Sequence, residues 1–95
     1  MKNLKPLNGN LLLKVQSFKT DVILKQEELE AILAKAFNEK DTFEVIDVCD
    51  TITTIKKGDI VKLQQGQAIP YIINTLEGKL FHVIVPYYNV LGIIN

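Results

Sequence analysis

Only one stretch of this chain spaces its apolar residues as an α-helix does. Between residues 27 and 38 apolar side chains recur at positions i, i+3, i+4, i+7 and i+8, which are Leu29, Ile32, Leu33, Ala36 and Phe37. Acidic residues fill the first turn and lysines follow towards the end, as the helix dipole favours. This spacing predicts an amphipathic helix over residues 27–38.

Short runs of β-branched and aromatic residues, separated by polar turns, make up most of the rest. In the run 42–48, Phe43, Val45 and Val48 are expected on one side of a strand, with Glu44 and Asp47 facing elsewhere. The turn at residues 56–59 contains Gly58, where we expect a positive φ. The expected strands are residues 10–15, 42–48, 60–63, 68–74 and 80–85, followed by a turn and a last short strand ending at Ile94.

Closely spaced strands with a single helix predict a mainly β fold, in the form of a small β-barrel with one inserted amphipathic helix. The 95 residues suit a single domain, residues 1–95, with a loop and helix insertion at about residues 16–41. A domain of this size buries only ~60–65% of its unfolded surface, so association between copies would add to its stability. We therefore expect a homo-oligomer.

The charge balance bears on possible partners and compartments. Eleven Lys and Arg residues match eleven Asp and Glu residues, for a formal net charge of zero, whereas nucleic-acid-binding proteins normally carry a basic excess. Cys49 is the sole cysteine, and no apolar run approaches the ~20 residues needed to span a bilayer. We expect a cytoplasmic protein that binds neither nucleic acid nor membrane.

The sequence offers few residues for catalysis or metal binding. Cys49 and His82 are each the only one of their kind, too few for a zinc tetrahedron or a catalytic triad. We expect Cys49 to be structural and His82 to be a solvated or hydrogen-bonded strand residue. The acidic residues at 27–30 are explained by the helix dipole, and the glycines are scattered singly, unlike a phosphate-binding loop. We therefore expect that the protein is not an enzyme and that it binds no metal and no cofactor.

Three segments together resemble the GroES-type co-chaperonins, the ring-shaped lids of chaperonins. Residues 4–14 place a lysine and a proline before a turn and an apolar strand that ends in lysine, as the family's opening does. Residues 55–61 (IKKGDIV) are similar to the family's V-K-x-G-D-x-V segment, the most specific of the three. Residues 82–94 are similar to the family's ending, which is an apolar strand, a polar turn and a last apolar segment, with Asn89 in place of the usual aspartate.

The resemblance implies a function in which the chain itself catalyses no reaction. The chain would be a GroES-like β-barrel subunit of a ring, most simply a heptamer, that caps the folding chamber of a chaperonin, with ATP bound by that partner. In the family the N-terminal strand pairs with the C-terminal strand of the neighbouring subunit. The subunit interface implied here consists of Leu4, Leu7, Val90, Leu91, Ile93 and Ile94.

The triplet Val22, Ile23 and Leu24 occupies a place comparable to that of the family's mobile loop, whose aliphatic triplet docks on the chaperonin. The resemblance therefore implies that these three residues bind the partner. A second interpretation comes from the residues themselves: the triplet lies just before the predicted helix, where it could form a short strand or a hydrophobic staple. Both interpretations remain open at this stage.

Two departures from the family favour a different class of protein. No glycine precedes the triplet, and only six residues separate Val48 from Ile55, too few for the hairpin that forms the family's roof. Such departures are typical of bacteriophage versions. The alternative is a viral structural protein, a capsid decoration or cement subunit located in the virion. A single-strand-binding barrel would need a basic groove beside its aromatic residues, and the neutral charge argues against one.

Overall fold

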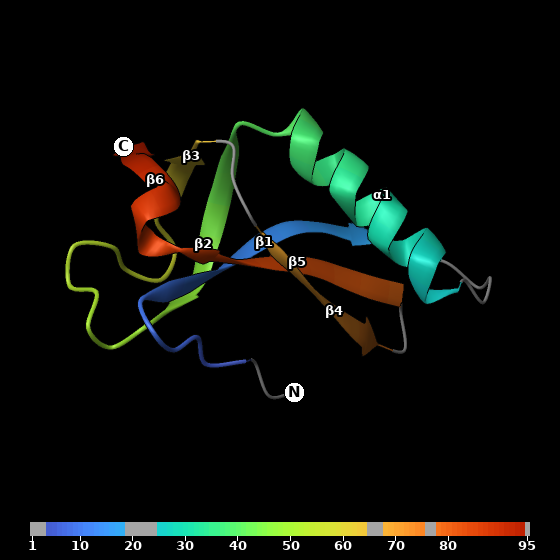
Figure 1. The fold of residues 1–95 in the computed structure, drawn as a ribbon, viewed down its shortest axis with the longest axis horizontal. Helices are drawn as coiled ribbons and strands as arrows, with labels where there is room; N and C mark the ends of the chain where they lie inside the picture. Colours follow the sequence, from blue (N-terminus) through green and yellow to red (C-terminus); the bar gives the residue numbers. More distant parts are fainter. Residues whose placement is uncertain (1–3, 19–24, 65–67, 76–77, 95) are drawn as a thin grey trace.

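The computed structural model describes residues 4–18, 25–64, 68–75 and 78–94. Within them, strands dominate and one α-helix is inserted, so the predicted mainly β fold with one inserted helix is confirmed (Figure 1). No helix in these ranges is long and apolar enough to cross a membrane. The elements are β1 (Asn10–Phe18), α1 (Gln26–Glu39), β2 (Thr42–Val48), β3 (Ile60–Leu63), β4 (Ile69–Thr75), β5 (Gly78–Pro86), the short 3₁₀ helix η1 (Tyr87–Asn89) and β6 (Val90–Ile94).

All six strands belong to one antiparallel sheet with the order β4-β5-β1-β2-β3-β6. The order makes β4 and β6 the two end strands, and Figure 1 shows β6 at the upper left and β4 at the lower right of the centre. The β4–β5 hairpin is paired as far as Thr75 opposite Gly78, so its tip, Leu76 and Glu77, lies outside the described residues. Every predicted strand is present, with β1 and β5 longer than expected.

The hydrophobic core lies between the sheet and α1. The helix contributes Leu29, Leu33 and Ala36 to it, while Ile32 and Phe37 pack at its margin. A helix of this length is marginal in water by itself, so burial of its apolar stripe against its own sheet stabilises it. The sheet contributes Leu11, Leu13, Val15, Phe43, Val45, Val61, Phe81, Val83 and Val85, and the segment before β3 adds Ile55.

The ends of α1 lie close to the predicted bounds, and a local contact fixes its start while a contact with β1 fixes its end. At its start, the carboxylate of Glu28 accepts the backbone N–H of Lys25 at 3.4 Å. At its end, Lys40 leaves the helix with extended backbone and its ammonium donates to the carbonyl of Val15 at 2.8 Å. The same ammonium lies 5.6 Å from the ring centre of Phe43. These contacts attach the C-terminal end of α1 to both β1 and β2.

A β-bulge explains the irregular spacing of core residues on β2. Leu13 of β1 is opposite Val45 and Leu12 is opposite Asp47, so Ile46 is the extra residue. The bulge places Val48 on the core side with Phe43 and Val45, and Asp47 on the other face, as the sequence predicts. Asp47 is nevertheless only 9% exposed, which the sequence pattern did not indicate.

Candidate interaction surface

The end strand β6 presents an open edge. It pairs with β3 on one side, with Ile93 opposite Val61 and Gly92 opposite Lys62, and no strand pairs with its other side among the described residues. Proteins commonly protect such edges with charged residues or proline. Residues 87–94 contain neither, whereas β4, the other end strand, carries Pro70. The β6 edge is thus the less protected end of the sheet.

Exposed apolar side chains gather around this strand. Large hydrophobic residues with exposures between 37% and 77% occur on β6, on η1 just before it and on the paired strand β3. Elsewhere in the described chain, only Leu7 and Ile69 are large, apolar and similarly exposed. We define the β6 patch as Ile60, Tyr87, Tyr88, Leu91, Ile93 and Ile94.

Four residues of the β6 patch, which are Tyr87, Tyr88, Leu91 and Ile93, line a hollow of about 310 Å³. The hydroxyl of Tyr87 lies 3.0 Å from that of Thr54, and this hydrogen bond holds one wall in place. None of the lining residues is charged. We call this site the Gly92 hollow; it is lined by Thr54, Ile55, Tyr87, Tyr88, Val90, Leu91, Gly92 and Ile93.

Charged contacts hold the N-terminal segment, residues 4–9, against the end of β2. The Lys5 ammonium donates to the carbonyl of Val48 at 2.8 Å and lies 2.9 Å from an Asp50 carboxylate oxygen. The Lys5 ammonium also lies 3.5 Å from a carboxylate oxygen of Asp47. The Lys57 ammonium lies 3.7 Å from the same oxygen. The hydrogen bond with Asp50, together with both negative charges, raises the pKa of Lys5. Asp47 can be buried because two lysines and the Val48 N–H surround it.

The same segment meets the start of η1. Asn8 and Gly9 have positive φ values of 60° and 75° and form a turn. The Gly9 carbonyl accepts the N–H of Tyr87 at 2.8 Å. The Asn10 side chain donates to the Leu7 carbonyl at 2.7 Å, which fixes the backbone of that exposed residue. The turn therefore links the N-terminal segment to η1, where the β6 patch begins.

The residues predicted for a subunit interface fall into two groups. Leu7, Leu91, Ile93 and Ile94 are exposed, as an interface requires, whereas Leu4 and Val90 are half-buried and Val90 packs against the core. The docking triplet Val22, Ile23 and Leu24 lies outside the described residues. The sequence pattern does not place Tyr87 and Tyr88 in a particular site. Their common hollow depends on contacts with Thr54, far away in the sequence.

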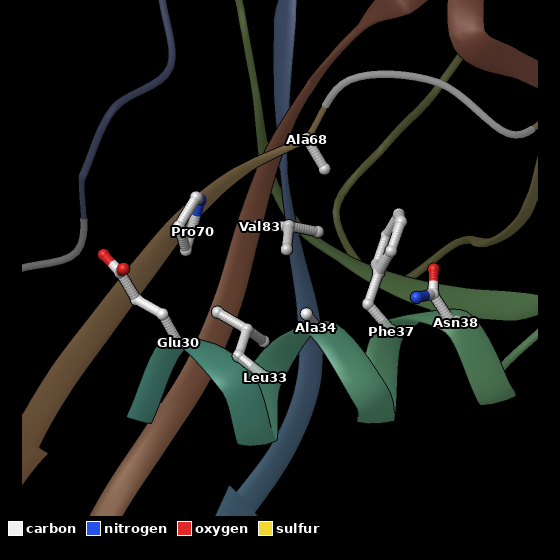
Figure 2. A pocket seen from close by; sticks show the side chains of 8 residues that line it. All are labelled: Glu30, Leu33, Ala34, Phe37, Asn38, Ala68, Pro70 and Val83. Carbon is white, nitrogen blue, oxygen red and sulfur yellow. The ribbon is translucent and has the colours of Figure 1, made fainter. Parts of the chain in front are cut away.

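A second hollow, of about 180 Å³, lies between α1 and the strands β4 and β5. Figure 2 shows apolar side chains from both layers turned towards one space, with the polar groups of Glu30 and Asn38 at its margin. The hollow is smaller than the ~300–1,000 Å³ of most ligand sites. Several of its walls, including Leu33, Phe37 and Val83, belong to the core or its margin. We interpret it as a packing gap between helix and sheet.

His82 and Cys49 are both buried but lie apart. His82 is opposite Lys14 on β1, whereas Cys49 donates its N–H to the carbonyl of Asn10. Asn10 and Lys14 are four positions apart along β1, or ~13 Å, so the two side chains do not form a catalytic pair. Burial is the main cause that lowers the pKa of His82, while hydrogen bonds with the backbone of Leu80 and Tyr71 act in the opposite direction. Of the two expectations for this residue, the solvated side chain is wrong and the hydrogen-bonded strand residue agrees with the structure. A hydrogen bond with the Thr51 hydroxyl, 3.2 Å away, is the main cause that lowers the pKa of Cys49.

Comparisons with known proteins give no indication of function, so the interpretation depends on the surface of the structure. No protein-family model and no curated protein matches this chain. In the described part of the chain, no three potential metal ligands cluster. The most distinctive site is the uncharged β6 patch, whose open backbone edge and apolar side chains are suited to binding another protein.

Proposed function

We propose that the protein is a non-enzymatic subunit of a homo-oligomer, and that the oligomer is a co-chaperonin-like ring that caps the folding chamber of a chaperonin. The observation that carries the proposal is the β6 patch on an unprotected end strand. The identity of the larger partner rests on the resemblance of residues 4–14, 55–61 and 82–94 to GroES-type co-chaperonins.

The size of the β6 patch supports assembly. If a large side chain exposes ~200 Å² when fully accessible, the six exposures amount to roughly 600 Å². Each partner in a standard protein interface buries about 800 Å². Burial of the patch at ~25 cal/mol/Å² corresponds to roughly 15 kcal/mol before the entropic costs of association are subtracted. Ile93 is opposite the buried Val61, whereas Ile60 is opposite Ile94 at the next register position, so these side chains lie on the two faces of the sheet. A partner on one face would cover only part of this area.

Docking on the chaperonin would use Val22, Ile23 and Leu24. An aliphatic triplet supplies only a weak contact in one subunit, but a ring repeats that contact and gains by avidity. ATP binding and hydrolysis would belong to the chaperonin, so the subunit itself needs no cofactor. Its contribution would be steric closure of the chamber.

The alternative is a viral structural protein that decorates or cements a capsid, and one observation favours it. Residues 49–59 connect β2 to β3 without forming a strand, so the segment that corresponds to the family's roof hairpin offers nothing to close the top of a chamber. Such a subunit would use the β6 patch to contact capsid proteins or other copies on the virion.

The first experiment is size-exclusion chromatography with light scattering, followed by mixing with a chaperonin in ATP. A ring of about seven subunits that forms a nucleotide-dependent complex with the chaperonin would support the proposal. A monomer or trimer that forms no such complex would contradict the ring and favour the viral structural protein. A matched run with ADP, and one without nucleotide, controls for nonspecific adhesion of the apolar patch.

A further inference from the structure

His82 is the most deeply buried titratable side chain among the described residues, at 5% exposed. It lies on the face of β5 that points away from α1, because its strand neighbours Phe81 and Val83 belong to the core. Its Nδ1 is buried and has no hydrogen-bond partner in the described part of the chain. A charged imidazole has an N–H at both nitrogens, so the Nδ1–H would be buried without an acceptor, which is unfavourable.

The two strands that flank His82 supply no negative charge beside its ring. Lys14 on β1 and Tyr71 on β4 are opposite His82, and the ring centres of Tyr71 and His82 are 6.2 Å apart. Glu44 on β2 is opposite Lys14 and therefore one strand further away. Burial, aided by Lys14, lowers the pKa of His82, and hydrogen bonds with the backbone of Leu80 and Tyr71 do not offset this effect.

Of the two flanking strands, β4 is the one that can separate at lower cost. It is an end strand that pairs with β5 alone among the described strands, and Pro70 has no N–H to donate to that pairing. None of the side chains of residues 69–73 is buried, whereas those of residues 11–13 and Val15 on β1 all are. On the other face of β4, Pro70 borders the hollow of about 180 Å³ beside α1, so packing there is incomplete (Figure 2). Elements with few buried contacts open before the whole domain unfolds.

We propose that His82 is an acid-sensitive latch, whose protonation releases the end strand β4 from β5 while the other strands stay paired. Separation of β4 admits water to the His82 ring, where the charged form is solvated. It also makes β5 the new end strand, with unpaired N–H and C=O groups that an extended segment of another chain can bind. The latch lies at the opposite end of the sheet from β6 and is independent of the proposed ring.

The experiment is amide hydrogen exchange of the unmodified protein by NMR at pH 7.5 and pH 5, with each rate divided by its intrinsic rate at that pH. We expect the protection of β4 amides to fall roughly fivefold more than that of β2 and β3 amides, because the open form takes up the proton first. His82→Phe cannot be protonated there, so its β4 protection should be the same at both pH values. His82 is the only histidine, so its ring signals follow its own titration without any variant.

Three results would overturn the latch. Equal loss of protection in every strand would mean that acid opens the whole subunit rather than β4. Unchanged β4 protection while the His82 ring signals titrate would show that the strand tolerates the charged ring. An undiminished acid response in a folded His82→Phe variant would assign the opening to another group.

Discussion

His82 is a titratable residue in a buried position, where a charged imidazole is unfavourable. Its side chain is 5% exposed, and its Nδ1 has no hydrogen-bond partner among the described residues. Lys14 is opposite His82 on β1, and the ring centres of His82 and of Tyr71 on β4 are 6.2 Å apart. Burial, aided by the positive charge of Lys14, lowers the pKa of His82 from its ordinary 6.5. The folded state therefore favours the neutral imidazole.

This difference predicts a loss of stability in mild acid. Because the folded pKa is below the unfolded value of 6.5, the unfolded chain takes up the proton first as the pH falls. The contribution of His82 is full above pH 6.5, is lost as the pH falls through the folded pKa, and then levels off. Urea unfolding between pH 7.5 and 5 should show this loss, and His82→Phe should show a smaller one. An equal pH dependence in both proteins would contradict the assignment.

Leu91 and Ile69 form a matched pair for testing the β6 patch. They are 61% and 62% exposed and lie on the opposite end strands β6 and β4. Leu91→Ser should weaken self-association about tenfold or more, since an aliphatic contact of ~1–3 kcal/mol is lost at each interface. Ile69→Ser should leave the sedimentation profile unchanged. If the Ile69 variant dissociates the oligomer and the Leu91 variant does not, the interface lies at the other end of the sheet.

At the scale of elements, substitutions in α1 measure how much its packing against the sheet stabilises the subunit. Leu33 is 2% exposed in the core, and the next residue, Ala34, is exposed. Leu33→Asp should destabilise the subunit by ~3 kcal/mol or more, because it removes apolar contacts and buries a charge without a partner. Ala34→Asp should cost less than ~1 kcal/mol. Urea unfolding of both variants measures the difference, and equal stabilities would mean that α1 does not depend on the sheet.

The elements also show what the sequence could predict. The apolar spacing at Leu29–Phe37, the positive φ of Gly58 and the irregular core positions of β2 are local properties, and all three are confirmed. The burial of Asp47 was missed because its lysine partners, Lys5 and Lys57, are distant in sequence. The order of the strands is likewise nonlocal, so the pattern could not show that β6 is an end strand. The exposure of four of the six predicted interface residues agrees with the resemblance but does not test it.

At the scale of the whole molecule, the fold separates two roles that one chain would combine. The β6 patch lies at one end of the sheet, whereas α1, which follows the residues of the proposed docking triplet, packs beside β1 and β5. A change at β6 can therefore alter assembly without touching the helix. A change near the start of α1 can alter docking while β6 keeps its pairing with β3. The two functions should separate by mutation.

Ile23→Ser is the variant that tests docking. If the protein is a working lid, this change should weaken ATP-dependent chaperonin binding by far more than tenfold, because a loss of ~1–3 kcal/mol per subunit is repeated around the ring. The melting temperature and the oligomeric state should remain those of the unmodified protein. If Ile23 instead packs as a hydrophobic staple on α1, the melting temperature should fall. Binding in ATP and thermal unfolding of the same sample therefore distinguish the two roles, and a variant that melts earlier yet binds the chaperonin normally would exclude the docking role of Ile23.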